Sequence, residues 1–149
     1  MKIINFYETN NKEYWISQIS KSDWGAGQYL AYLLQENKLF DLVGENSRVL
    51  MLIEGENLIS FCTLAKLDDV QPTDLTPWIG FVYTYPEYRG KRLAGKLLTF
   101  AEKLAKQDGA TDVYISTNHI GLYEKYGYEF FTEAKDVEGE NTRVYKKTI

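Results

Sequence analysis

Only one cysteine, Cys62, and one histidine, His119, occur in the 149 residues. A lone cysteine excludes an internal disulfide, and these two residues are too few for a cysteine-rich or histidine-rich metal cluster. Cys62 lies in the apolar run SFCTLA, which favours a buried structural thiol over a nucleophile. We therefore expect neither a metal site nor covalent chemistry on a thiol.

The chain also lacks an apolar run of the about 18 residues that a membrane-spanning helix needs. Its N-terminus, MKIINFYETNNKEYW, has no apolar core like that of a signal peptide. The chain also has no excess of positive charge, since its formal net charge is −4. Nucleic-acid-binding proteins usually carry a basic surface. These absences predict a cytoplasmic protein with no membrane and no nucleic-acid partner.

What is present is a composition typical of a globular protein, with 44% hydrophobic and 26% charged residues. We find no repeat, low-complexity tract or linker, so a single domain over 1–149 is expected. The chain is rich in aromatic residues, with 12 tyrosines. Tyrosines often line pockets because they combine an apolar ring with a polar hydroxyl.

Hydrophobic periodicity and turn residues predict seven strands and four helices. The strands are expected at 3–7, 48–53, 58–67, 78–85, 112–117, 128–133 and 143–148, and the helices at 13–19, 22–42, 93–105 and 121–125. Ser22 or Asp23 is expected to cap the second helix, and Gly44 to end it. The helix at 93–105 predicts a right-handed parallel crossover between the strands beside it. The expected fold class is α/β, with a mixed sheet flanked by helices.

The segment YPEYRGKRLAGKLL, from Tyr85 to Leu98, joins a predicted strand to the predicted amphipathic helix. The start of a helix presents unpaired N–H groups and the positive end of the helix dipole, which together favour a phosphate. Cations at this end oppose the dipole, so a bound anion would explain their placement. The alternative is a solvated helix terminus with cations on its surface. The glycine spacing matches neither the dinucleotide fingerprint nor the P-loop.

Together with the segment LYEKYGY at 122–128 and the order of elements, this turn resembles the GCN5-related N-acetyltransferase (GNAT) family. In that family a strand ending in V-x-P-x-x-R-G leads into a turn with the pattern [QR]-x-x-G-x-[GA]. Pro86, Arg89, Gly90 and Ala94 match these patterns, whereas Arg92 stands where the second pattern has its glycine. Any residue supplies a backbone N–H, so a phosphate cradle tolerates Arg92 if the turn needs no positive φ there.

The resemblance implies acetyl-CoA as cosubstrate and a splayed strand end beside it. Carried over by position, the residues at the acetyl group, pantetheine arm and pyrophosphate are Val82, Tyr83, Thr84, Arg89, Gly90, Lys91, Arg92, Leu93, Ala94 and Gly95. Many members carry a coenzyme-binding asparagine seven residues before the tyrosine of the second segment. Here that position is Ser116, and Asn118 lies close by, so both are candidates for the pantetheine amides.

Acetyl transfer to an amine needs a neutral nitrogen, a donor for the oxyanion and a proton for the departing thiolate. The family segment L-Y-E-K-x-G-[FY] implies Tyr123 as the catalytic acid. A phenol of ordinary pKa near 10 is protonated at neutral pH and can donate to a thiolate. The alternative is a core or pocket tyrosine whose hydroxyl is satisfied within the protein.

The general base is not predicted. His119 follows a parallel strand, at the end where ligands gather in α/β sheets, but an exposed loop histidine is the simpler interpretation. Asp68 and Asp69 end another central strand and could attract a protonated amine, or form a solvated acidic loop. Water relays are a further route. Trp24 and Tyr29 lie in the part of the chain that, by resemblance, covers the acceptor side, although such residues are often core.

The leading hypothesis is an acetyl-CoA-dependent N-acetyltransferase that transfers an acetyl group directly to a primary amine. The acidic balance favours a small cationic acceptor, while peptide amines stay open. The alternative function is a catalytically silent acyl-CoA-binding sensor or partner module, and a weaker one is an interaction protein without a coenzyme site. Members of the family are often dimers, so a homodimer is also open.

Overall fold

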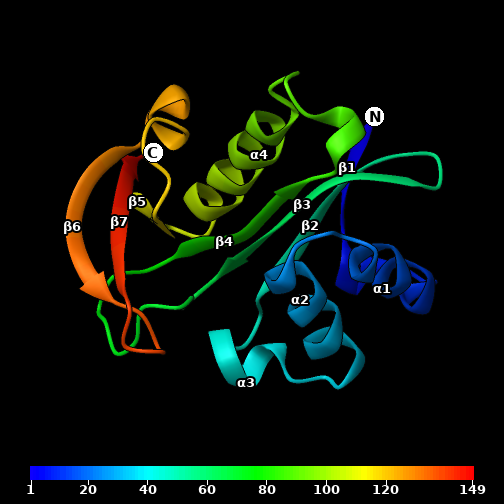
Figure 1. The fold of residues 1–149 in the computed structure, drawn as a ribbon, viewed down its shortest axis with the longest axis horizontal. Coiled ribbons are helices and arrows are strands. Elements are labelled where there is room, and N and C mark those ends of the chain that lie inside the picture. Colours follow the sequence, from blue (N-terminus) through cyan, green and yellow to red (C-terminus); the bar gives the residue numbers. More distant parts are fainter.

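The computed structural model describes residues 1–149 and forms a seven-stranded sheet with helices on both faces (Figure 1). The strands are β1 (Lys2–Asn5), β2 (Arg48–Glu54), β3 (Asn57–Ala65), β4 (Trp78–Thr84), β5 (Asp112–Thr117), β6 (Glu129–Lys135) and β7 (Asn141–Thr148). The α-helices are α1 (Lys12–Ser20), α2 (Gly25–Gln35), α3 (Leu39–Val43) and α4 (Leu93–Gln107), and short 3₁₀ helices are η1 (Phe6–Glu8), η2 (Pro86–Tyr88) and η3 (Tyr123–Tyr126). The predicted fold class is confirmed.

The spatial order of the strands is β1-β2-β3-β4-β5-β7-β6. Only β4 and β5 pair in parallel, and α4 connects them, so the predicted crossover is confirmed. The other neighbouring strands are antiparallel, including the predicted hairpins β2–β3 and β6–β7. The last strand, β7, lies between β5 and β6, which places β6 at the edge.

The core consists of two layers, one on each face of the sheet. Helices α1 to α3 cover one face and α4 covers the other, as Figure 1 shows. Strand β2 is apolar at consecutive positions because its side chains alternate between these layers. Val49 and Met51 pack with the α1–α3 side, and Leu50 and Leu52 with the α4 side.

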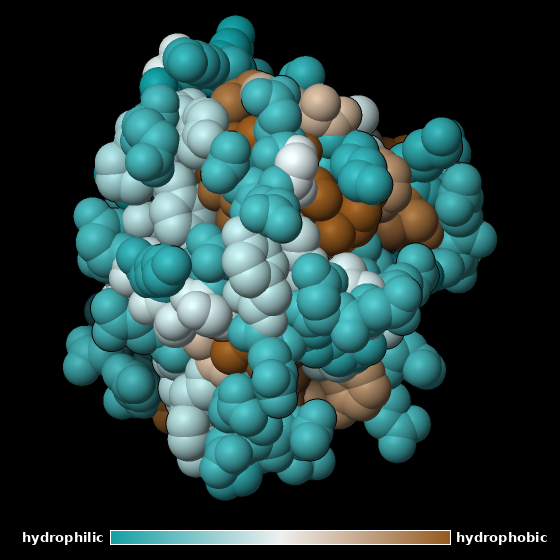
Figure 2. Space-filling view, turned by 90° about the vertical axis from the view of Figure 1, so that its right-hand side faces the viewer, coloured by the Kyte–Doolittle hydropathy of each residue, from teal (hydrophilic) through white to brown (hydrophobic).

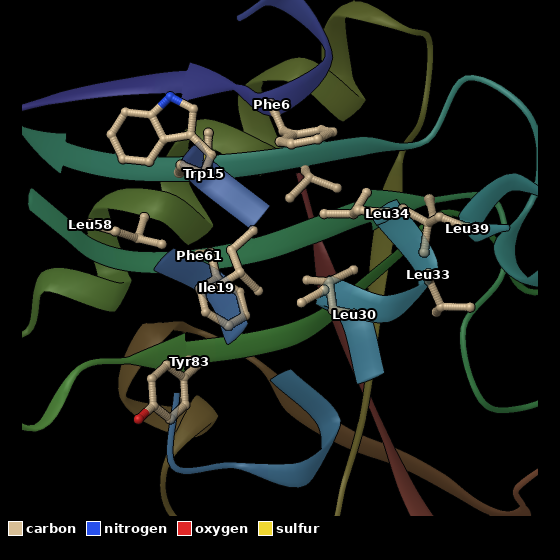
Figure 3. Close-up of a cluster of buried hydrophobic side chains, with 14 of the residues drawn as sticks. Phe6, Trp15, Ile19, Leu30, Leu33, Leu34, Leu39, Leu58, Phe61 and Tyr83 are labelled. Carbon is tan, nitrogen blue, oxygen red and sulfur yellow. The ribbon is translucent and has the colours of Figure 1, made fainter. Parts of the chain in front are cut away.

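Figure 3 shows the layer beneath α1 and α2, in which Phe61 of β3 and the leucines of α2 belong to one cluster. Tyr83 of β4 lies at the border of this cluster, and its hydroxyl points away from the leucines. The ring of Tyr83 is buried, with 7% of the residue exposed. Tyr83 therefore belongs to the core through its ring, while its hydroxyl lies at the border of the core.

The prediction of one helix over 22–42 is wrong, because the structure divides this segment into α2 and α3. Asn37 adopts φ 55° and ends α2. The N–H groups of Asn37 and Lys38 donate to the carbonyl oxygens of Leu34 and Leu33 at 3.3 and 2.8 Å. This is the Schellman arrangement, in which asparagine replaces the more usual glycine.

The predicted cap at Ser22 or Asp23 is also wrong. The helix begins at Gly25 with Trp24 in the N-cap position, and no side chain caps it. Asp23 instead accepts a hydrogen bond from the Tyr83 hydroxyl and forms an ion pair with Arg89 at 3.7 Å. The Asp23 carboxylate therefore binds Tyr83 and Arg89, which are distant in sequence, and does not cap α2.

Strand β4 is irregular where it passes the middle of the sheet. Its register with β3 shifts, so that Phe61 faces Tyr83 while Thr63 faces Gly80, and Phe81 within this bulge has φ 50°. The parallel pairing with β5 is confined to Trp78 and Tyr114. The two strands therefore diverge beyond that pair, which is the splayed strand end that the family resemblance implies.

Hydrophilic residues cover most of the face in Figure 2, and the apolar patches there are separated by polar side chains. None of the helices combines the length and the apolarity that crossing a membrane requires.

Candidate active site

A cleft of about 1360 Å³ follows β4 and is walled by the start of α4, the end of β5, η3 and the segment before α2. Ten of the residues predicted from the sequence line it: Val82, Tyr83, Thr84, Arg89, Gly90, Arg92, Leu93, Ala94, Ser116 and Tyr123. The other three, Lys91, Gly95 and Asn118, do not. The structure thus brings the turn, the strand end and the tyrosine segment to one cleft, while the roles of these residues stay predictions.

The turn before α4 differs from the expectation at Arg92. Gly90 has φ 81°, and Arg92 at the N-cap of α4 has φ 56° and ψ 29°. The condition that the turn needs no positive φ at this residue is therefore not met. A left-handed conformation costs a non-glycine residue about 1 to 2 kcal/mol. Arg92 adopts it nonetheless, and no side chain caps the helix start beside the cleft.

Tyr126 of η3 covers the start of α4. The guanidinium of Arg92 lies 5.6 Å from the centre of the Tyr126 ring. Gly95 faces the same ring, and a Cβ at that position would lie 2.7 Å from Tyr126 Cε1. Gly95 therefore serves the close packing of η3 on α4 and does not itself line the cleft. Tyr126 packs on α4 here and also lines the cleft.

The Arg89 side chain connects the turn to the segment before α2. Its guanidinium lies 3.7 Å from Asp23 Oδ1, its Nε donates to the Thr84 carbonyl oxygen at 2.9 Å, and its Cζ lies 5.3 Å from the Tyr83 ring centre. Trp24 stacks on the same Tyr83 ring, with the two ring centres 5.7 Å apart and the rings nearly parallel. The Arg89 side chain therefore braces two walls of the cleft.

Tyr123 lies in η3 with 7% of its surface exposed and lines the cleft. Burial raises the pKa of its phenol above the ordinary value, and the nearby Cys62, Tyr126 and Asp68 raise it further. The neighbouring Tyr128 hydroxyl donates to Glu102 Oε2 at 2.8 Å, whereas Tyr123 has no such protein partner. Tyr123 therefore keeps its proton at neutral pH and has it free for a ligand.

The remaining candidates on the β5 side have local partners. Ser116 Oγ lies 2.8 Å from Thr142 Oγ1 of β7, while Asn118 is exposed. His119 is exposed at the rim of the cleft, and its backbone N–H donates to Thr117 Oγ1. Cys62 is fully buried, and this burial raises the pKa of its thiol to about 12, as expected for a structural cysteine.

Asp68 and Asp69 both line the cleft on its acidic wall, which also receives Asp136 and Glu138 from the β6–β7 turn. The turn is held there because the Val137 N–H donates to the Asp69 carbonyl oxygen at 2.8 Å. Asp69 Oδ1 is buried without a hydrogen-bond partner. The cationic side chains of the cleft, Arg89, Arg92 and Lys125, come from the other elements. The cleft therefore has an acidic wall formed by the β3–β4 loop and the β6–β7 turn, and cationic side chains on other walls.

Burial and the charge of Asp69 raise the pKa of the Asp68 carboxyl to about 7. An acid whose native pKa exceeds its unfolded value destabilises the fold as pH rises through this interval. We therefore expect Asp68→Asn to match the parent near pH 4 and to be more stable above pH 7. The upper limit is about 4 kcal/mol, reduced because the side chain is only partly buried. Urea unfolding at both pH values measures this, and equal stability at pH 8 would contradict it.

Gly80 and the β6–β7 turn were not identified from the sequence. A glycine inside a predicted strand is a recognisable sign that another group approaches the backbone closely. Gly80 shows this, because a Cβ there would lie 2.1 Å from Asp68 Oδ1. Nothing in the sequence places Asp136 and Glu138 beside Asp69, since that depends on β7 pairing with β5.

Comparison with known proteins identifies the family and the fold. The family model described as acetyltransferase (GNAT) family matches residues 7–128. Aminoglycoside 6'-acetyltransferase type Ii is a similar solved structure, with TM-score 0.72, 17% identity and coverage of 99% of this chain and 97% of that one. The aminoglycoside 6'-N-acetyltransferase from Enterococcus faecium has TM-score 0.72 and 14% identity, with the same coverages.

An acyl-CoA N-acyltransferase from Pseudomonas aeruginosa has TM-score 0.67 and 24% identity, over 99% of this chain and 97% of that one. A search of curated protein sequences found no match. At these identities the solved structures establish the fold, and the family model, which spans most of the chain, establishes the family. The chain belongs to the GNAT family of acetyltransferases, whose cosubstrate is acetyl-CoA.

Proposed function

We propose that this protein transfers the acetyl group of acetyl-CoA to a primary amine of a small cationic molecule. One observation carries the proposal: the cleft joins a helix start with a cationic turn to an acidic wall across the same strand, β4. The first suits a diphosphate and the second an ammonium group. A thioester carbonyl bound along β4 would lie between them.

We assign each group of cofactor residues predicted from the sequence a role along this cleft. The backbone of Val82, Tyr83 and Thr84 would face the acetyl group and pantetheine arm, and the N–H groups from Gly90 to Ala94 would face the pyrophosphate. Tyr123 would face the sulfur from η3. Its raised pKa makes complete proton transfer to a thiolate unfavourable, so it acts first as a hydrogen-bond donor as the C–S bond breaks.

Amino sugars are the first acceptors to test. The acidic wall offers several carboxylates to a molecule that carries more than one ammonium group. Two structural neighbours are named as aminoglycoside acetyltransferases, and their fold covers nearly the whole of this chain. Polyamines share the same charge, so the acceptor panel includes both classes, with peptide amines as the third.

The decisive experiment is the release of free thiol from acetyl-CoA across this amine panel. We expect turnover with at least one cationic amine and none with neutral alcohols. Binding of acetyl-CoA without turnover on any amine would favour the alternative of a silent acyl-CoA sensor. Failure to bind acetyl-CoA at all would contradict the proposal.

The cofactor end has a matched pair of variants on α4. Ala94→Asp places a negative charge in the cleft beside the proposed diphosphate, and we expect acetyl-CoA to bind at least about tenfold more weakly. Thr99→Asp makes the same charge change at an exposed position of the same helix and should bind as the parent does. Calorimetry measures both affinities, and equal values for the two variants would move the diphosphate away from this turn.

A further inference from the structure

We propose that Asp68 accepts the proton that the acceptor amine loses during acetyl transfer, and that Gly80 is required to admit its carboxylate to that position. The inference rests on the proposed acetyltransferase function and extends it to the residue that the sequence left unassigned. It begins from the contact between the β3–β4 loop and the middle of β4.

Gly80 leaves space that the Asp68 carboxylate occupies. A Cβ on Gly80 would lie 2.1 Å from Oδ1, 2.7 Å from Cγ and 3.1 Å from Oδ2 of Asp68. Real side chains do not approach so closely, so any other residue at position 80 would displace the carboxylate. The next residue, Phe81, lies in the β-bulge, and β4 has already separated from β5 at this point. The carboxylate therefore lies where the sheet opens into the cleft.

The protein supplies this carboxylate with a backbone N–H from Asp69 but with no cationic partner. Asp68 forms no ion pair, and the titratable groups that face it are Asp69 from its own loop and Tyr123 from η3. Neither group carries a positive charge, so no cation neutralises the Asp68 carboxylate. A partly buried carboxylate without a cationic partner is costly to the fold, and this cost is explained if its partner is an ammonium group of the substrate. Its pKa of about 7 suits proton transfer at neutral pH.

The proton balance follows directly. An acceptor ammonium carries three protons on nitrogen, and the amide product carries one. Asp68 takes the first proton, which frees the nitrogen lone pair to form the C–N bond with the thioester carbon. The C–S bond then breaks while the Tyr123 hydroxyl donates a hydrogen bond to the departing sulfur. The second proton leaves the nitrogen in the same step and replaces the phenol proton as that proton passes to the thiolate, so that Tyr123 never becomes a phenolate. Asp68 returns its proton to solvent.

The test is the pH dependence of kcat/KM for a primary amine of pKa near 10. The parent should bind the ammonium form, so kcat/KM should rise about tenfold per pH unit below pH 7 and then level off. Asp68→Asn lacks the base and can react only with the fraction of the amine that is already neutral. Its kcat/KM should keep rising to about pH 9 without a plateau and should be at least about 100-fold lower at pH 7. A parent-like plateau and rate in Asp68→Asn would overturn the assignment.

Three further measurements separate proton transfer from structural damage. A weakly basic amine is already neutral at pH 7, so Asp68→Asn should lose less than about tenfold with it. Asp69→Asn removes a neighbouring charge and keeps the base, so its plateau should persist with a midpoint at lower pH. Gly80→Ala should imitate Asp68→Asn although Asp68 is present, and parent-like kinetics of Gly80→Ala would overturn the role of Gly80.

Affinity for acetyl-CoA distinguishes this inference from the proposed function. All three variants should bind acetyl-CoA as the parent does, because the proposed cofactor residues are unchanged, and this binding also shows that they fold. A parent that does not bind acetyl-CoA contradicts the function itself. Normal binding with an unchanged pH profile in Asp68→Asn contradicts only the role of Asp68.

Discussion

Tyr123→Phe should lower kcat by about 100-fold or more while leaving the affinity for acetyl-CoA unchanged. The substitution removes one hydroxyl and keeps the ring. Tyr123 is buried, with 7% of the residue exposed. Packing is therefore retained, and the lost group is the donor to the departing sulfur. Steady-state kinetics at saturating acetyl-CoA measures the change.

Tyr14→Phe is the matched control for this prediction. Its hydroxyl donates to the Glu56 carbonyl oxygen in the β2–β3 turn and does not line the cleft. Removing it should leave kcat within about twofold of the parent. A similar kcat in Tyr123→Phe and Tyr14→Phe would exclude the acid role of Tyr123.

Glu102→Ala should lower the free energy of unfolding by about 3 kcal/mol. Glu102 is a buried carboxylate of α4 that accepts hydrogen bonds from Tyr128 Oη at 2.8 Å and Lys147 Nζ at 2.9 Å. Its removal leaves the buried Tyr128 hydroxyl without its acceptor and Lys147 without its carboxylate partner. An unsatisfied buried donor costs more than the hydrogen bond itself contributes. Urea unfolding followed by tryptophan fluorescence gives the value.

The surface pair between Arg48 and Asp108 provides the comparison. Its atoms approach to 2.6 Å, yet the Asp108 side chain is 52% exposed. We expect Asp108→Ala to cost less than about 1 kcal/mol, since water replaces the lost partner. If both substitutions cost the same, burial does not control the strength of the Glu102 network.

The Glu102 network also links stability to the cleft. Lys147 Nζ donates a second hydrogen bond to the Tyr126 carbonyl oxygen at 2.9 Å, and Tyr126 belongs to η3 with Tyr123. The last strand, β7, thus helps to fix the segment that presents the proposed acid. Such a link joins residues distant in sequence and depends on the strand order.

Elements with strong local patterns were predicted correctly. The stripe of α4 that contains Leu97, Leu98 and Ala101 is buried as its periodicity indicates, and the hairpin around Gly55 forms between β2 and β3. The helix at 22–42 failed because Asn37 takes the left-handed conformation, which periodicity does not register. The cap at Asp23 failed because Tyr83 and Arg89 compete for its carboxylate.

The same contrast applies to the site. Two short segments, around Gly90 and Tyr123, indicated the family and a coenzyme cleft, because a turn before a helix and a segment motif are local features of the chain. The left-handed Arg92 and the bracing role of Arg89 could not be predicted, since both depend on neighbours in space. The acidic wall was anticipated only at Asp68 and Asp69, without its partners from the β6–β7 turn.

The sequence by itself determined the mixed α/β class, the crossover between the central strands and the family to which the chain belongs. Those properties depend on periodicity and on residues close together along the chain, where elementary sterics and hydrogen bonding decide. Only the tertiary structure decided which carboxylates face the cleft and where the Asp68 carboxylate lies in it. It did so because Gly80, in the bulged strand β4, leaves room for Asp68 of the β3–β4 loop, a residue twelve positions earlier in the chain.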